Sequence, residues 1–284
     1  MAKILKLKER IKSNKYLEKP IRLMVRPWLW YGMQKSNFNA WLREKGLKKF
    51  PEFDYLLNWK DSHKGERCFI VATGPSLTIY DLNLIKNEYS MSMNSGALLM
   101  EKTIWKPDII GISDEYVYQK MESDLLRIFT GPNKGRLLLS DYVQSFFKSA
   151  KQFRSFPVNL LNHKFVHEKT GVIKFSADSH KIIYTDYSVI FCMMQLAVYM
   201  GFSEIYLLGS DCNYNQAKAH LVDHGATDPF AAHAGDRLIY IHSKFKDFAD
   251  SKGVKVYNCT RGGMLEVYPR KNLEDVVNKR MYRY

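Results

Sequence analysis

The sequence of 284 residues lacks several features that would assign it to a common class of protein. No uninterrupted apolar stretch approaches the roughly 18 residues that a membrane-spanning helix needs, and the N-terminus is charged, so we expect neither a transmembrane helix nor a signal peptide. The chain has only four cysteines, and none of them forms a C-x-x-C pair. Their scatter argues against a disulfide framework or a zinc site and indicates reduced, buried thiols in a cytoplasmic protein, at Cys68, Cys192, Cys212 and Cys259.

The usual glycine-rich nucleotide fingerprints are also missing. The stretch CFIVATGPSL (68–77) is an apolar run that stops at Gly-Pro-Ser. Ala72 and Leu77 stand at two of the glycine positions of G-x-G-x-x-G, and no Gly-Lys-Ser/Thr follows, which argues against a dinucleotide oxidoreductase and a P-loop enzyme. We expect instead a short turn between a strand and a helix that opens at Pro75, where free backbone amides would bind an anion. A purely structural turn is the alternative.

Positive charge is concentrated in the first 50 residues. They hold 14 Lys and Arg against three Glu, a net charge of +11, while the whole chain carries +14. Trp28, Trp30 and Trp41 are interleaved with these charges, which suits a helix or helical hairpin on an anionic membrane surface. A charged helical segment packed on the main domain and a dimerisation arm are the alternatives. Nucleic acid is not expected as a partner, because the rest of the chain has no basic stripe to continue the footprint.

From Glu66 onward, strand-like and helix-like segments alternate, and 46% of the chain is hydrophobic. This pattern predicts an α/β fold that is modified Rossmann-like, with a mostly parallel sheet and helices on both faces. The predicted strands are 67–74, 89–94, 106–114, 135–140, 204–211 and 254–260, and the predicted helices are 76–86, 115–129, 187–201 and 236–253. We divide the chain into a basic aromatic helical extension with its linker (1–64) and a nucleotide-binding catalytic domain (65–284) with a small lid at about 212–232.

Ligands of such sheets bind at the carboxyl ends of the strands, where the order of the strands reverses. The residues at these ends are Thr73, Gly74, Asn94, Asp114, Gly209, Asp211 and Asn258. A carboxylate at Asp211 can orient a sugar hydroxyl, and the hydroxyl of Tyr214 can stabilise a leaving phosphate. A capping Asp and a half-buried Tyr are the structural alternatives.

Two histidines follow in the predicted lid. His220 and His224 have the i, i+4 spacing that zinc sites use, but no Glu follows the first of them, and Gly225 favours a loop. We therefore predict no metal site. A histidine in a loop beside a phosphate-binding cleft is suited to act as a general base, because its pKa lies near neutrality. Ordinary surface histidines are the alternative.

Four segments together resemble a known superfamily. They are ATGPSL (72–77), YSVIFCMMQLAVYMGFSEIYLLGSD (187–211), HLVDHG (220–225) and GVKVYNCT (253–260). They look like the bacterial sialyltransferases of glycosyltransferase family 42. They look equally like the related domain-of-unknown-function family 115, which includes 6-hydroxymethylpterin pyrophosphokinase-like proteins and flagellin-modifying motility accessory factors. The resemblance covers about residues 68–267 and does not include the basic extension.

The resemblance implies a fold with a lid that binds a CMP-activated nonulosonic acid without a metal. It implies that a loop contacts the donor phosphate through Thr73, Gly74, Pro75 and Ser76. Two donor-contacting asparagines of the family fall on Asn94 and Asp114; an acid at the second position argues against an anionic donor sugar.

The resemblance also implies the catalytic groups. The general base of the family falls on His224, or on His220 if the local alignment shifts. A leaving-group tyrosine falls on Asn213, next to Tyr214.

The predicted function is an inverting glycosyltransferase that transfers a sugar from a CMP-type nucleotide sugar to a cell-surface glycan or lipid-linked acceptor. It would need no cofactor and would be cytoplasmic, or peripheral at the inner face of the cytoplasmic membrane. One alternative is an ATP- and Mg²⁺-dependent 6-hydroxymethylpterin diphosphokinase-like enzyme, whose metal Asp114 and Asp211 could hold. Another is a non-catalytic nucleotide-binding protein. The sequence does not determine whether the chain forms a homo-oligomer.

Overall fold

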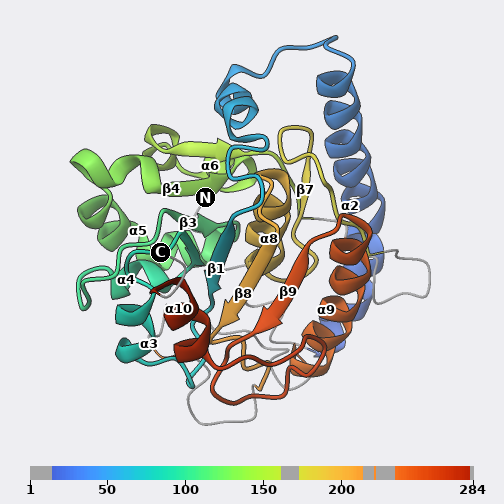
Figure 1. The fold of residues 1–284 in the computed structure, drawn as a ribbon. Coiled ribbons are helices and arrows are strands. Elements are labelled where there is room, and N and C mark those ends of the chain that lie inside the picture. Colours follow the sequence, from blue (N-terminus) through green and yellow to red (C-terminus); the bar gives the residue numbers. More distant parts are fainter. Residues whose placement is uncertain (1–14, 161–172, 214–220, 222–233, 282–284) are drawn as a thin grey trace.

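The computed structural model describes residues 15–160, 173–213, 221 and 234–281. Its centre is a seven-stranded parallel sheet with helices on both faces (Figure 1), which confirms the predicted fold class. The strands stand in the order β5-β4-β3-β2-β1-β8-β9. Their bounds are Arg67–Val71 (β1), Ser90–Met93 (β2), Ile109–Ile112 (β3), Leu137–Ser140 (β4), Arg154–Phe156 (β5), Glu204–Leu208 (β8) and Lys255–Asn258 (β9). A second, two-stranded sheet pairs β6 (Val158–Asn159) with β7 (Ile183–Tyr184).

The order of the strands reverses between β1 and β8. The chain moves outward from β1 to β5 on one side of the sheet, and β8 and β9 then extend it on the other side of β1. β1 and β8 are paired in parallel over their full length, and at their carboxyl ends Val71 faces Leu208. This reversal point is where open α/β sheets bind their ligands.

Helices lie between the strands and at both ends of the described chain. They are α2 (Lys15–Glu44), α3 (Ile79–Leu84), α4 (Gly96–Leu99), α5 (Glu115–Ile128), α6 (Asp141–Phe146), α8 (Val189–Tyr199), α9 (Ala234–Ser251) and α10 (Leu273–Met281), with 3₁₀ helices η1 (Pro51–Trp59), η2 (Gly131–Arg136) and η3 (Ser149–Gln152). The helices predicted at 115–129, 187–201 and 236–253 correspond to α5, α8 and α9. No helix among the described residues combines the length and the apolar character needed to cross a membrane.

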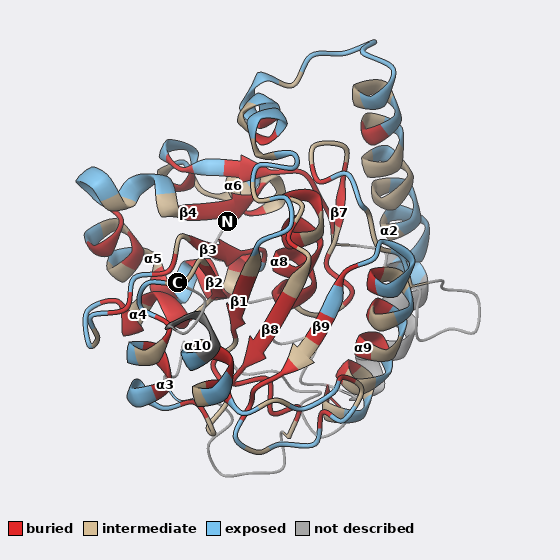
Figure 2. Ribbon diagram, viewed as in Figure 1, coloured by how far each residue is buried: buried red, intermediate tan, exposed pale blue. Residues whose placement is uncertain are grey.

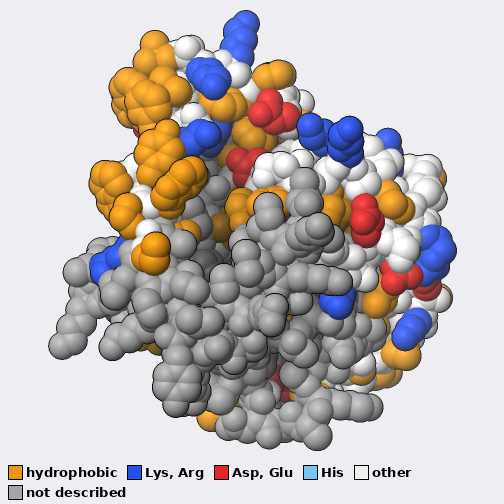
Figure 3. Space-filling view, turned by 180° about the vertical axis from the view of Figure 1, so that it is seen from behind, with side chains coloured by type: hydrophobic (Ala, Val, Ile, Leu, Met, Phe, Trp, Pro, Cys, Tyr) orange, Lys and Arg blue, Asp and Glu red, His pale blue; other side chains and the backbone are white. Residues whose placement is uncertain are grey.

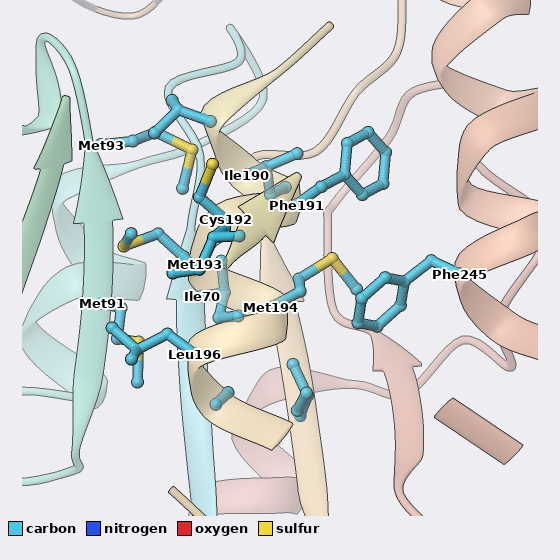
Figure 4. Close-up of a cluster of buried hydrophobic side chains, with 14 of the residues drawn as sticks. Ile70, Met91, Met93, Ile190, Phe191, Cys192, Met193, Met194, Leu196 and Phe245 are labelled. Atoms are coloured by element: carbon cyan, nitrogen blue, oxygen red, sulfur yellow. The ribbon is translucent and has the colours of Figure 1, made fainter. Parts of the chain in front are cut away.

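The sheet is buried on both faces (Figure 2), as expected for parallel strands covered by helices. Alternate residues of β1 show this: Ile70 packs in the cluster around α8, whereas Phe69 and Val71 pack in the cluster that includes Leu82 of α3. Figure 4 shows the first cluster, in which Met193 of α8 points toward Met91 and Met93 of β2, and Met194 points toward Phe245 of α9. The four cysteines are free and buried, as the sequence predicted.

The stretch 51–64, expected as a linker, is part of the body. It forms the 3₁₀ helix η1, and Phe53 and Leu56 are almost completely buried in the main core. The reason is their apolar character, since burying such side chains contributes about 1.5–3 kcal/mol each. The segment 153–180 contributes β5 and β6, and its residues 161–172 lie outside the described part.

α2 is held along the small sheet by polar contacts. Asn159 Nδ2 donates to Asn37 Oδ1 (3.0 Å), and Arg43 Nε donates to the carbonyl of Lys181 (3.0 Å). Ala40 is buried on the same side of the helix. The extension therefore packs on the body through one face.

Asp141 lies close enough to Arg43 of α2 to interact with its charge. We expect this carboxyl group to give the stability of the protein an unusual pH dependence. Burial raises the pKa of Asp141 to about 7. The hydrogen bond that the Val158 N–H donates to its carboxylate (3.1 Å) and the positive charge of Arg43 both lower this pKa, but they do not offset the effect of burial. The folded protein thus binds a proton between pH 4 and 7 that the unfolded chain releases, so stability falls as pH rises through this window. We expect Asp141→Asn to remove about 1–3 kcal/mol of this fall, measured by urea unfolding at pH 4.5 and 7.5. Equal pH profiles for wild type and Asp141→Asn would contradict the assignment; Asp54→Asn, at an exposed carboxylate, is the control.

Candidate functional site

Two glycines allow the loops after β1 and β8 to touch at the reversal point. The N–H of Gly74 donates to the carbonyl of Gly209 (2.9 Å). A Cβ on Gly74 would lie 1.9 Å from Asp211 Oδ2 and 2.4 Å from the carbonyl oxygen of Gly209. Gly209 has φ +61°, and a Cβ there would lie 2.6 Å from the carbonyl oxygen of Ala72. Both positions therefore require glycine.

Asp211 connects the two loops. Its carboxylate accepts a hydrogen bond from Ser76 Oγ (2.9 Å) and another from the Ser76 backbone N–H. Burial raises the pKa of Asp211, while the two bonds from Ser76 and the charge of Arg270 oppose that rise. The side chain is almost fully buried, so the loop after β1 is fixed to the end of β8 by a buried carboxylate.

The helix after this loop begins later than the sequence led us to expect. α3 starts at Ile79, and Thr78 caps it in a reciprocal arrangement: the Asp81 N–H donates to Thr78 Oγ1 (3.2 Å), and the Thr78 N–H donates to Asp81 Oδ2 (3.0 Å). The prediction of a helix opening at Pro75 with free amides is wrong. Thr78 and Asp81 form a capping box, which sets the start of the helix. The amides of Gly74 and Ser76 are occupied by Gly209 and Asp211.

The loop after β2 lies beside Thr73 and contains unpaired polar atoms. Asn94 has φ +48°, and a Cβ on Gly96 would lie 3.7 Å from the Thr73 methyl group. Asn94 Oδ1 and Ser95 Oγ are buried and have no hydrogen-bond partner within the described part of the chain. Ser210 Oγ, after β8, is also buried and has no hydrogen-bond partner among the described residues. Because buried polar groups are usually paired, these three atoms are well suited to meet a polar ligand.

Our sequence reasoning named Asn94 but missed Ser95 and Ser210. Each serine directly follows a residue or strand that we had selected, in the segments MNSG (93–96) and LGSD (208–211). Position after a buried parallel strand was the signal that could have identified them.

Two other predicted residues serve the fold. Asp114 is exposed and caps α5, because its Oδ1 accepts the N–H groups of Tyr116 (2.8 Å) and Val117 (3.1 Å). Asn258 is buried; its Nδ2 donates to the Leu265 carbonyl (2.7 Å), and its Oδ1 accepts the Thr260 N–H (2.9 Å). Asp114 therefore serves as the N-cap of α5, a role that the sequence analysis did not give it, and Asn258 supports the segment after β9.

The segment after β9 closes over Asp211, which sequence reasoning did not anticipate. Gly263 has φ +80°, and a Cβ there would lie 2.4 Å from the Asp211 carbonyl oxygen. Met264 N–H donates to the same oxygen (2.7 Å), and Ser210 N–H donates to Thr260 Oγ1 (3.0 Å). The glycine pair in TRGGM (260–264) was the available signal.

A second unpredicted loop, at 185–188, precedes α8. Asp186 and Tyr187 have φ values of 38° and 78°, a conformation that non-glycine residues rarely adopt. The guanidinium of Arg237 lies 4.4 Å from the centre of the Tyr187 ring and so links this loop to the first turn of α9. Strained backbone of this kind often occurs at functional sites.

The predicted lid is described at Cys212, Asn213 and Leu221. The N–H of Leu221 donates to the carbonyl of Thr73 (2.7 Å). A Cβ on Gly235, at the start of α9, would lie 2.3 Å from the Cys212 carbonyl oxygen. Asn213 is half-buried. Tyr214, His220 and His224 lie outside the described residues, so their predicted roles stay predictions.

The described residues contain no cluster of side chains that could bind a metal ion. Across residues 15–160, 173–213, 221 and 234–281, no three His, Cys, Asp or Glu side chains gather in an arrangement that could hold an ion.

The solved structures with a similar fold include two glycosyltransferases. The Maf glycosyltransferase of Magnetospirillum magneticum AMB-1 is 15% identical, with a TM-score of 0.43 over 78% of this chain and 38% of that chain. A mammalian sialyltransferase is 10% identical, with a TM-score of 0.33 over 78% of this chain and 85% of that chain. The protein thus spans well under half of the first of these relatives, and both likenesses concern the fold alone. No curated protein matches the sequence significantly.

A family model gives the assignment. The model described as 6-hydroxymethylpterin diphosphokinase MptE-like matches residues 43–217, which is more than half of the chain. This match confirms the resemblance to the superfamily that the sequence motifs indicated. The protein belongs to the MptE-like family.

Proposed function

We propose that the protein is an inverting glycosyltransferase that moves a sugar from a CMP-type nucleotide sugar to a cell-surface glycan or lipid-linked acceptor. The observation that supports this most is the bond from the Leu221 N–H to the Thr73 carbonyl. It holds the one described residue of the HLVDHG segment (220–225) against the loop after β1. Leu221, from the segment that resembles the lid of the glycosyltransferases, therefore contacts the loop that resembles their phosphate loop.

In this proposal the donor phosphate binds through side chains, since the loop amides are used by the protein itself. Ser95 and Ser210 are hydroxyl donors with no partner in the described residues, and Asn94 lies beside Ser95. Thr73 is a neighbour of this loop. Asp211 acts as a positioning residue, because it holds Ser76 and with it the turn after β1.

The proposed reaction is a single displacement. His224, or His220 in its place, takes the proton of an acceptor hydroxyl, and the acceptor oxygen attacks the anomeric carbon from the side opposite the phosphate. The bond between the anomeric carbon and the phosphate oxygen breaks, and its electron pair leaves with the nucleotide. Tyr214 and the serine hydroxyls stabilise the charge on the departing phosphate.

A second candidate is diphosphate transfer from ATP to a pterin-like alcohol, which the description of the family favours. That reaction needs Mg²⁺ held by carboxylates. Asp114 and Asp211 were the predicted ligands, but Asp114 caps α5 and Asp211 accepts two hydrogen bonds from Ser76. Because both carboxylates already serve the fold, we prefer glycosyl transfer.

A thermal-shift screen against CMP, CDP, UDP, GDP and ATP, with and without EDTA, tests the proposal. We expect CMP at 100 times its dissociation constant to raise the Tm by about 5 °C, and EDTA to leave this shift unchanged. Stabilisation by ATP alone that EDTA abolishes would contradict glycosyl transfer in favour of the diphosphokinase. Failure of every nucleotide would contradict both enzymes in favour of a non-catalytic protein.

A further inference from the structure

α2 carries a large apolar face that points away from the body. Met24, Trp28, Tyr31 and Phe38 are spaced by four, three and seven residues, so they lie on one face of the helix. Their exposed fractions are 78%, 80%, 62% and 57%. Trp30 and Trp41 are also exposed, about 100–120° around the helix from Met24. We call Met24, Trp28, Tyr31 and Phe38 the outward face of α2.

The apolar side chains of the outward face do not pack α2 on the body, because a different face of the helix makes that contact. Ala40 is buried, and it lies about 160° around the helix from Met24 at 100° per residue. Asn37 and Arg43, which bond Asn159 and the Lys181 carbonyl, belong to the same side as Ala40. A helix that only covers the body would carry polar side chains on its outer face. α2 instead has a second apolar side.

Basic residues lie on the outward face and beyond one end of it. Lys35 lies on it and is exposed, and Lys45, Lys48 and Lys49 are exposed just beyond the C-terminal end of the helix. Figure 3, seen from behind, shows hydrophobic side chains gathered along this side of the molecule with Lys and Arg side chains among them. The first 50 residues carry a net charge of +11 in the sequence. Aromatic side chains combined with Lys and Arg on one helix are typical of helices that lie in the headgroup region of a bilayer.

We propose that the outward face of α2 docks on an anionic phospholipid surface. Charge favours this surface over a second copy of the chain. Two copies that met through α2 would bring together two N-terminal segments with a net charge of +11 each, which repel one another, whereas anionic headgroups attract each Lys and Arg. The aromatic rings would enter the interface while the long basic side chains reach the headgroups. The opposite face would stay packed on β6 and β7.

Vesicle co-sedimentation of the full chain tests this inference without any measurement of catalysis, so its outcome is independent of the proposed function. The vesicles contain either phosphatidylcholine alone or phosphatidylcholine with 30% phosphatidylglycerol. The test variant is Trp28→Ser/Tyr31→Ser/Phe38→Ser. The control variant is Ile104→Ser/Tyr240→Ser, which removes two exposed apolar side chains of the body (63% and 55% exposed). Circular dichroism and Tm verify that both variants are folded.

We expect wild type and control to bind the anionic vesicles at least about tenfold more tightly than the neutral ones, and the test variant to lose at least about tenfold in affinity for the anionic vesicles. Lys35→Gln should weaken binding by about fivefold. Equal binding by wild type and the test variant, or equal binding to both vesicle types, would overturn the inference. So would a dimer of the free protein, seen by light scattering, that the test variant dissociates.

Discussion

Replacing His224 with alanine is expected to lower the rate of transfer by at least about 100-fold and to leave nucleotide binding unchanged. In the proposed mechanism the imidazole removes a proton from the acceptor and does not contact the donor nucleotide. The measurement is a single-turnover transfer assay beside a thermal-shift titration with the same nucleotide. A loss of binding equal to the loss of rate would show that His224 holds the donor and is not the base.

His220→Ala and His180→Ala complete this experiment. His180 lies at the seam with η1, where its Nε2 is 3.8 Å from Asp54, and its replacement should leave the rate unchanged. If His220→Ala reduces the rate and His224→Ala does not, the base is His220. Normal turnover by both lid variants would dispose of the proposed mechanism.

Gly74→Ala is expected to destabilise the protein by about 2–4 kcal/mol and to abolish nucleotide binding. The added Cβ would overlap the Asp211 carboxylate and the backbone oxygen of Gly209. The carboxylate could rotate away, but the backbone oxygen belongs to a loop that is itself restricted at Gly209. The loops after β1 and β8 would have to separate, which removes the contact that forms the site.

Gly262→Ala is the matched control for this prediction. Gly262 lies in the segment that closes over Asp211, and among the described residues a Cβ there would meet only Ser76 Cβ, at 3.9 Å. This is ordinary van der Waals contact, so we expect stability within about 0.5 kcal/mol of wild type. Urea unfolding of the two variants gives the comparison. Equal unfolding midpoints would contradict the close approach of the two loops.

Local sequence signals were sufficient for the central part of the fold. α5 was predicted at 115–129 and is observed at Glu115–Ile128, because Asp114 caps a strongly amphipathic segment. The buried strands β1 and β8 were recognised from continuous apolar runs that end in glycine. The start of α3 was misjudged because two start signals compete there: proline at position 75 and the Thr78–Asp81 capping box, of which the second determines the helix.

The remaining features depend on contacts between distant parts of the chain. Ser76 and Asp211 are 135 residues apart, so no local pattern could show that the carboxylate would occupy the amide of the loop. The two strands of the small sheet have two residues each, which is too short for a periodic pattern. A ligand site at the reversal point of the strands therefore stays a prediction, and in our proposal the groups offered to a ligand change from amides to side-chain hydroxyls.

Hydrogen exchange measured by mass spectrometry with and without nucleotide tests the central claim most directly, since it locates the bound phosphate without assuming a reaction. With CMP, UDP, GDP and ATP examined separately, we predict that at least one slows exchange in the peptides covering 72–77, 94–97 and 209–213. Protection confined to other parts of the chain, or no change in these three peptides with any of the four nucleotides, would contradict a nucleotide site between β1 and β8.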